Sequence, residues 1–273
     1  MKVAILAGGH GTRLAEETQV RPKPMVEIGG NPLLWHIMMH YSRYGLQEFV
    51  IALGYKGEYI KRYFADYCSL NGNLRFMMGG EGPPVVEPHA APHPPWQIDL
   101  IETGLETLTG GRIKRLAPYL GDKTFMLTWG DGVSDVNLGE LLAFHRSHGK
   151  LATVTTVRPP ARYGHMSFDG HRVVKFSEKP QTAEGWINGA FFVLEPEVLE
   201  YIESDMVMFE HYPLEQLAMD GELMAYKHTG FWACMDTLRD KTRLQEMWDS
   251  GERPWATWEK QECGSLSPAI SAT

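Results

Sequence analysis

Short runs of consecutive, largely apolar residues recur along the chain, and several of them end at a glycine. Residues 3–7, 49–53, 123–129 and 151–157 are runs of this kind. A strand that is buried on both faces has no reason to alternate apolar with polar positions, so continuous apolar sequence is typical of parallel strands inside a sheet. The pattern therefore predicts four buried strands.

Helical spacing of apolar positions follows several of these runs, over residues 33–44, 55–67 and 138–148. Strands that alternate with such segments are typical of α/β proteins. Residues 165–194 form short, strand-like segments that are separated by turn residues, as expected for antiparallel strands added to the core sheet. We predict an α/β fold with a mixed, mostly parallel sheet that is flanked by helices.

The chain has 273 residues and is 43% hydrophobic, which is close to the upper size of one domain. We predict a single domain over residues 1–262. Within it, residues 79–95 read GGEGPPVVEPHAAPHPP. Because this density of proline and glycine opposes a helix or a central strand, we predict a loop there. The small and polar residues 263–273 are expected to be frayed or disordered.

Charge and cysteine usage exclude several classes of protein. The formal net charge of −8 would repel a nucleic-acid backbone, so no nucleic-acid partner is expected. Three cysteines without a CxxC spacing argue against a disulfide framework and a structural zinc site. No segment has the roughly 20 apolar residues that span a membrane, and the run at 3–7 is too short for a signal-peptide core. We expect a cytoplasmic protein without a membrane partner.

A glycine-rich turn, Leu6-Ala7-Gly8-Gly9-His10-Gly11-Thr12-Arg13-Leu14, follows the first predicted strand. Backbone N–H groups in such a turn can form a concave anion site, and the planar guanidinium of Arg13 suits phosphate oxygens. A Rossmann fingerprint would need glycine in place of Leu14, and a Walker A loop would need lysine followed by serine or threonine. Neither pattern is present, and the turn taken alone could serve structure only.

Three charged residues stand at positions that suit a phosphate-handling site. Lys23 lies between two prolines, which hold its backbone extended, although an isolated lysine in such a turn is usually a solvated surface residue. Asp131 follows a predicted strand, where the ligand crevice of an open α/β sheet forms, but an Asp-Gly turn would look the same. Asp236 could be a metal ligand or a helix N-cap before Thr237.

Other residues are interpreted as packing residues. His36 and His40 have metal-ligand spacing on a predicted helix, but position 37 is isoleucine and the glutamate of a zinc-protease motif is absent. We therefore expect them in packing or on the surface. Four late tryptophans are expected to fill the core or subunit contacts. They are Trp232, Trp248, Trp255 and Trp258.

Seven segments together resemble one enzyme family over nearly the whole chain. They read LAGGHGTRL, PKPMVEIGGNPLLWHIM, TGGR, GDG, FSEKP, NGAFF and GFWACMDTLRDK. This series resembles the signature of the nucleotidyltransferases that activate sugar 1-phosphates, and within them the glucose-1-phosphate cytidylyltransferases. The resemblance implies a Rossmann-like fold of the nucleotidyltransferase and glycosyltransferase-A type.

The resemblance also implies a role for each matched position. The residues implied in nucleotide binding are Leu6, Ala7, Gly8, Gly9, Gly11, Thr12, Arg13, Thr109, Gly110, Gly111, Arg112 and Gly130. Those implied in binding the sugar phosphate are Lys23, Glu178, Lys179 and Asn188. The implied catalytic residues are Arg13, Lys23 and Asp131, and the implied ligands of Mg²⁺ are Asp131 and Asp236.

The implied reaction is attack of α-D-glucose 1-phosphate on the α-phosphorus of CTP, which gives CDP-glucose and pyrophosphate. The resemblance further implies a homo-oligomer, namely a hexamer, and a place in the synthesis of dideoxysugars for the O-antigen of bacterial surfaces. Two alternatives stay open at this point. The same chemistry could use another sugar 1-phosphate or UTP or dTTP, or the chain could be a non-catalytic sugar-nucleotide sensor. Ala190, where the family motif has glycine, would narrow the sugar pocket by one methyl group.

Overall fold

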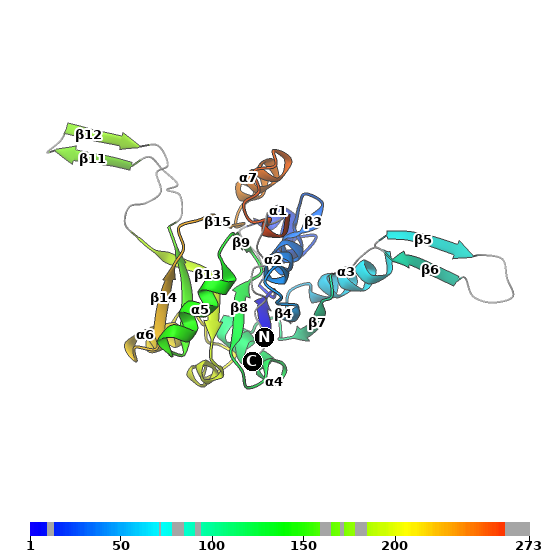
Figure 1. The fold of residues 1–273 in the computed structure, drawn as a ribbon, viewed down its shortest axis with the longest axis horizontal. Coiled ribbons are helices and arrows are strands. Elements are labelled where there is room, and N and C mark those ends of the chain that lie inside the picture. Colours follow the sequence, from blue (N-terminus) through cyan, green and yellow to red (C-terminus); the bar gives the residue numbers. More distant parts are fainter. Residues whose placement is uncertain are drawn as a thin grey trace.

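A seven-stranded sheet forms the centre of the computed structural model (Figure 1). The structure describes residues 1–9, 14–70, 72–77, 85–90, 94–158, 165–169, 172–177 and 185–259. The strand order is β14-β10-β13-β8-β1-β4-β7. The bounds are Lys2–Leu6 for β1, Glu48–Leu53 for β4, Gln97–Glu102 for β7, Phe125–Trp129 for β8, Ala152–Val157 for β10, Ile187–Leu194 for β13 and Leu223–Lys227 for β14.

Strand β1 lies at the middle of the parallel part of this sheet. It pairs in parallel with β4 on one side and with β8 on the other. Val3, Ala4 and Ile5 are fully buried, and alternate residues of the strand belong to two separate clusters of apolar side chains on the two faces. This double burial is the reason that residues 3–7 read as an uninterrupted apolar run.

One strand runs against the rest. Strand β13 is antiparallel to both β8 and β10, whereas β10 and β14 are parallel to each other, as are β4 and β7. The prediction of a mixed, mostly parallel α/β sheet is confirmed.

Helices cover both faces of the sheet, which is the layered arrangement of an α/β protein. The apolar cluster on one face includes residues of α2, α3, α5 and α7, and the cluster on the other face includes residues of α4 and α6. The helix bounds are Ala15–Thr18 for α1, Leu33–Ser42 for α2, Gly57–Leu70 for α3, Thr109–Leu120 for α4, Leu138–His148 for α5, Tyr212–Met219 for α6 and Leu238–Asp249 for α7. The 3-10 turns are Lys23–Met25, Pro196–Tyr201 and Thr257–Glu259. No helix in the described part of the chain is both long and apolar enough to cross a membrane.

Two short ribbons of two strands each stand apart from the central sheet (Figure 1). The first pairs β5 (Gly72–Met77) with β6 (Val85–Ala90), and the second pairs β11 (His165–Asp169) with β12 (Arg172–Ser177). Two predictions need correction here. Residues 85–90 form a strand and not a loop, because each strand of a two-stranded ribbon has a free edge that tolerates Pro88. Of the antiparallel strands expected in 165–194, only β13 joins the core sheet. The predicted tail, 263–273, lies outside the described residues.

A further pairing of short strands matters for the site. Strand β9 (Gly132–Ser134) follows β8 directly and pairs antiparallel with β15 (Trp232–Cys234). The register places Cys234 opposite Gly132, and the backbone N–H of Met235 donates to the carbonyl of Asp131 at 2.9 Å. Two segments about a hundred positions apart in sequence are thereby tied together at the end of β8.

The backbone of β13 is irregular where it carries the NGAFF motif. The pairing of β13 with β10 shifts between Val154 and Thr156, which marks a bulge, and Ala190 there has a φ of 62°. A non-glycine residue in this left-handed region costs roughly 1–2 kcal/mol. Ala190 is held there partly by its own N–H, which donates to Oδ1 of Asn188 at 2.7 Å. The residue that the family motif places here, glycine, is the one that this conformation favours.

Replacing Ala190 with glycine is expected to raise the free energy of unfolding by about 1 kcal/mol, because the strain at positive φ disappears. The matched control is Ala225→Gly in β14, where the residue is exposed on an ordinary strand and glycine should be destabilising. Urea unfolding of both variants measures the two changes. Equal destabilisation by both substitutions would show that Ala190 is not strained.

Candidate active site

Three charged side chains from distant parts of the chain meet in one cluster. The ammonium of Lys23 donates to Oδ2 of Asp131 at 2.8 Å and to Oδ1 of Asp236 at 2.6 Å. The lysine is separated from its partners by 108 and 213 positions in sequence. Its side chain is only 11% exposed, and those of the two aspartates are 27% and 17% exposed. The convergence of Lys23, Asp131 and Asp236 that the sequence only suggests is therefore present.

The position of Lys23 depends on the end of β8. Lys23 starts the 3-10 turn Lys23–Met25, which Pro22 and Pro24 stiffen. A side chain at Gly130 would place its Cβ 2.8 Å from Cγ of Pro24, so glycine at 130 allows the turn to pack on the strand end. The N–H of Gly130 also donates to the carbonyl of Leu6 at 3.0 Å. The glycine next to Asp131 thus brings the lysine and the aspartate together.

Asp236 is positioned by β15 and by the start of α7. The N-cap of this helix is Thr237, whose hydroxyl accepts from the N–H of Asp240 in a reciprocal capping box. The N–H of Asp236 itself donates to Oδ2 of Asp240 at 3.1 Å. The alternative that Asp236 is the helix N-cap is therefore wrong. Its carboxylate is turned to Lys23 instead.

Lys23 remains charged because of its partners. Burial would lower the pKa of its ammonium, but the negative charge of Asp131 and the hydrogen bonds to Asp131 and Asp236 outweigh burial and raise this pKa above 10.5. The stability that this raised pKa contributes is present below 10.5 and is lost only as the pH rises through the folded-state value. At neutral pH the cluster therefore holds a permanent cation.

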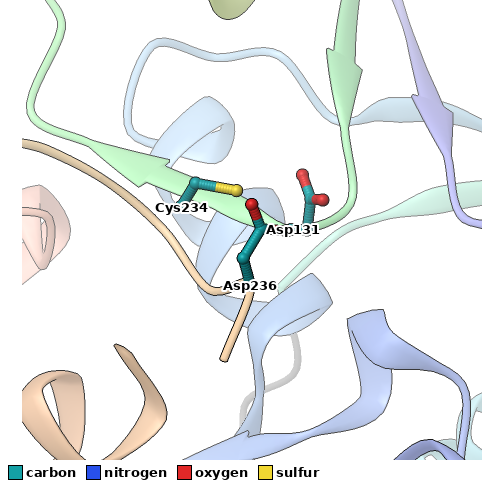
Figure 2. A group of neighbouring side chains, drawn as sticks. All are labelled: Asp131, Cys234 and Asp236. Atoms are coloured by element: carbon teal, nitrogen blue, oxygen red, sulfur yellow. The ribbon is translucent and has the colours of Figure 1, made fainter. Parts of the chain in front are cut away.

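A thiol completes the cluster, and sequence analysis missed it. One ligand atom each from Asp131, Cys234 and Asp236 lie within 4.8 Å of one another, and Figure 2 shows the Cys234 sulfur beside the Asp236 carboxylate. Burial first, and then the charge of Asp131, raises the pKa of the Cys234 thiol, so it is neutral at physiological pH. The signal was available, because residues two apart at a strand end share one face, and Cys234 precedes Asp236 by two.

A cavity of about 320 Å³ opens beside this cluster. Its lining residues are Leu6, Ala7, Gly8, Gly9, Lys23, Pro24, Leu105, Glu106, Thr107, Leu108, Thr109, Arg112, Trp129, Gly130, Asp131, Met208 and Asp236. The cavity therefore joins the first part of the glycine-rich turn to the charged cluster, as expected for a nucleotide site at the carboxyl ends of β1 and β8.

Arg112 shapes one wall of this cavity through its side chain. The guanidinium is only 4% exposed and donates to the carbonyls of Leu53, Gly104 and Leu105 and to the hydroxyl of Thr103, at 2.7–3.1 Å. A Cβ at Gly8 would lie 2.4 Å from its Nη1. The guanidinium thus ties the ends of β4 and β7 together beneath the glycine-rich turn. We interpret Arg112 as a positioning residue, which holds the part of the cavity wall beside the start of the glycine-rich turn.

Gly110 and Gly111 have a packing role next to it. A Cβ at Gly110 would lie 2.7 Å from the carbonyl oxygen of Val207, and one at Gly111 would lie 2.5 Å from backbone atoms of Asp205. Residues 205–209 therefore pack directly on the start of α4, and Thr109 accepts from the N–H of Phe209 there at 2.9 Å. The two glycines do not line the cavity, whereas Thr109 does.

The remaining predicted site residues divide into three groups. Leu6, Ala7, Gly8, Gly9 and Gly130 line the cavity. Asn188 is exposed and does not line the cavity. Its side-chain oxygen accepts a hydrogen bond from the backbone N–H of Ala190. The predicted residues that lie outside the described part of the chain are Gly11, Thr12, Arg13, Glu178 and Lys179.

The two histidines are packing residues. Nε2 of His36 is 2.8 Å from the carbonyl of Ile28, and Nδ1 of His40 is 2.9 Å from the hydroxyl of Thr257. Burial lowers their pKa values to about 4 and about 3. Trp255 is fully buried beside them, and Trp232, Trp248 and Trp258 pack against the same core cluster. The interpretation of these residues as packing residues is confirmed.

Arg112→Lys is expected to weaken nucleotide binding on the order of tenfold and to lower the melting temperature, because an ammonium cannot reach all four acceptors that the guanidinium holds. Calorimetric titration with CTP and thermal unfolding measure both effects. The matched control is Arg115→Lys on the same helix, where an exposed guanidinium pairs with Asp205 and little should change. Equal effects of both substitutions would contradict the positioning role of Arg112.

Known proteins resemble this chain over most of its length. The family model for nucleotidyl transferases matches residues 2–232. The glucose-1-phosphate cytidylyltransferase of Salmonella typhi is 49% identical over 260 residues, which cover 95% of this chain and 100% of that protein. The probable glucose-1-phosphate cytidylyltransferase of Bacillus subtilis (strain 168) is 44% identical, over 94% of this chain and 100% of its own.

A solved structure agrees with the fold. HddC from Yersinia pseudotuberculosis superposes with a TM-score of 0.66 at 25% identity, over 90% of this chain and 99% of that one. The mostly parallel sheet, the described start of the glycine-rich turn after β1 and the lysine-aspartate cluster agree with the motif series and with the extent of these matches. This chain belongs to the nucleotidyl transferase family.

Proposed function

We propose that this chain transfers the cytidylyl group of CTP to α-D-glucose 1-phosphate and releases pyrophosphate. The observation that carries the proposal is one cavity lined both by the glycine-rich turn and by the cluster of Lys23, Asp131 and Asp236. The choice of CTP and glucose 1-phosphate is supported by relatives that are 44–49% identical over their whole length and carry this activity in their names.

Nucleotidyl transfer requires the positioning of two anions and the neutralisation of charge at the attacked phosphorus. The ammonium of Lys23 is held at the cavity, where it can bind the phosphate of the incoming sugar and the α-phosphate of the nucleotide. In this proposal a sugar-phosphate oxygen attacks the α-phosphorus in line, the bond to the pyrophosphate oxygen breaks, and no covalent intermediate with the protein forms.

The glycine-rich turn supplies the nucleotide side of the site. Among the described residues, a Cβ at Gly9 would meet nothing within 4 Å, and Gly9 lines the cavity. Phosphate oxygens can approach such a backbone closely. The residues outside the described part of the chain enter the proposal by resemblance. Arg13 would bind the triphosphate, and Glu178 and Lys179 would bind the sugar phosphate. Asn188, which the structure describes outside the cavity, enters as a sugar-phosphate ligand by resemblance as well.

Asp131 and Asp236 fit a magnesium ion. Carboxylate oxygens are the hard ligands that Mg²⁺ prefers, and these two carboxylates already share one cation, the ammonium of Lys23. Bound there with substrate oxygens, the ion would supply several kcal/mol of charge stabilisation at the phosphates. The protein's part is to hold the two carboxylates together through the pairing of β9 with β15.

We also infer a homo-oligomer, a hexamer by resemblance, and a cytoplasmic location. The two ribbons, β5–β6 and β11–β12, support the oligomer, because an isolated two-stranded hairpin is at best marginally stable in water and is stabilised by packing against another surface. The free thiol of Cys234 is in keeping with a reducing compartment. A monomeric mass by sedimentation equilibrium would contradict the oligomer, and enrichment in a secreted fraction would contradict the location.

The function is tested by a panel of triphosphates and sugar 1-phosphates with Mg²⁺, in which pyrophosphate release and product masses are recorded. CTP with glucose 1-phosphate is expected to give the highest kcat/KM and the mass of CDP-glucose. A higher value with UTP, dTTP or another sugar phosphate would reassign the substrates and keep the chemistry. Nucleotide binding without turnover for every pair would favour the sensor alternative.

Asp131→Asn tests the catalytic role of Asp131, because asparagine keeps the size of the side chain and removes its charge. Turnover is expected to fall on the order of 100-fold or more, since the proposed role of Asp131 is metal placement. Thermal unfolding shows whether the variant stays folded at the assay temperature. Unchanged turnover in a folded variant would remove Asp131 from the site.

A further inference from the structure

We propose that Cys234 is a third protein ligand at the metal position, and that its sulfur makes this position prefer thiophilic divalent ions such as zinc and cobalt over magnesium. The proposal rests on the proposed function in one respect, namely that Asp131 and Asp236 hold the metal. It adds a ligand and a metal selectivity that an all-oxygen site would not have. Zinc would then act as a tight-binding competitor of magnesium.

The local fold directs the thiol to the carboxylates. Strand β15 ends at Cys234, which lies opposite Gly132 in the ladder with β9. Gly132 has no side chain to fill the space there, and among the described residues a Cβ at that position would meet one atom within 4 Å, the carbonyl oxygen of Ala233 at 3.8 Å. Because Cys234 and Asp236 are two positions apart at the end of a strand, their side chains emerge on the same side. Figure 2 shows them together next to Asp131.

The distances suit a shared ion after small side-chain movements. The three ligand atoms lie within 4.8 Å of one another. Two ligands of one tetrahedral zinc ion are about 3.3 to 3.7 Å apart, from metal–ligand bonds of about 2.0 to 2.3 Å. Each side chain therefore has to move by about 1 Å or less, which rotation about its χ angles can supply.

The site also attracts a cation in the present structure. The ammonium of Lys23 lies between the two carboxylates, and the three ligand residues are neither fully buried nor fully exposed. A divalent ion has more charge than the ammonium and can replace it between the carboxylates. The two carboxylates therefore already hold one positive charge, that of the protein's own lysine.

Ligand chemistry then sets the preference. Magnesium takes oxygen ligands and leaves a thiol uncoordinated, whereas zinc and cobalt bind thiolate sulfur strongly. When such an ion binds, the metal–sulfur bond forms, the S–H bond breaks and the proton passes to solvent, so no oxidant or reductant is needed. Three protein ligands leave one tetrahedral position open, which is the ligand count of catalytic zinc sites.

Cobalt binding tests the proposal without turnover. Co²⁺ is titrated into the full chain in the absence of Mg²⁺, nucleotide and sugar phosphate, and absorption is recorded in the near ultraviolet, where sulfur-to-cobalt charge transfer appears. The wild-type protein is expected to develop this band at one equivalent. Cys234→Ser and Cys234→Ala are expected to lack it and to bind Zn²⁺ on the order of tenfold more weakly by calorimetry. Their affinity for Mg²⁺, measured with nucleotide present, should stay within about twofold.

A double variant, Cys68→Ser with Cys263→Ser, is the matched control because it removes the other two thiols and should retain the band. Saturation of the wild-type protein with Co²⁺ without a charge-transfer band would overturn the proposal, as would a band that survives Cys234→Ser and disappears in the double variant. The band is measured on wild-type protein, so it does not depend on the folding of the variants. A band together with no turnover in the substrate panel would reject the proposed reaction and leave the sulfur ligand standing.

Discussion

The antiparallel pairing of β9 with β15 is the constraint on which the site depends. This short ladder and the hydrogen bond from Met235 to Asp131 hold two segments together that are about a hundred positions apart in sequence. One consequence is that two carboxylates lie close enough to repel each other, and the ammonium of Lys23 between them neutralises part of that charge. The pairing therefore creates the acidic site, and the lysine makes it stable without a metal.

A second part of the cavity wall is arranged by the same kind of interaction. The guanidinium of Arg112 holds four acceptors at the ends of β4 and β7, as Lys23 holds two carboxylates at the end of β8. Glycine at position 8, in the first part of the glycine-rich turn, leaves room for Arg112, and glycine at position 130, after β8, leaves room for the turn that carries Lys23. The family's glycines thus serve the approach of protein groups as much as the approach of phosphate.

Local pattern predicted the parts of the fold that follow from burial. The predicted segments agree to within a few residues with strands β1, β4, β8 and β10 and with helices α2, α3 and α5. A buried strand has a continuous run of apolar residues in its sequence, and a helix packed on the sheet has apolar residues at helical spacing. Strand β7 went unrecognised because its residues are only partly buried. The ribbon strand at 85–90 was hidden by proline, and Cys234 was considered only as a possible disulfide or zinc cysteine. The meeting of Lys23 with Asp131 and Asp236 depends on tertiary pairing, which spacing in sequence does not encode and only the family resemblance suggested.

The most direct test locates the metal. Crystals of the protein with Mn²⁺ in place of Mg²⁺ and a non-hydrolysable CTP analogue allow the ion to be placed by its anomalous scattering. The expected result is one peak within bonding distance of carboxylate oxygens of both Asp131 and Asp236 and of the α-phosphate, with the Lys23 ammonium moved from between the carboxylates to a phosphate oxygen. An ion bound elsewhere, with Lys23 still paired to both aspartates, would contradict the assignment of this cluster as the metal-binding centre of the site.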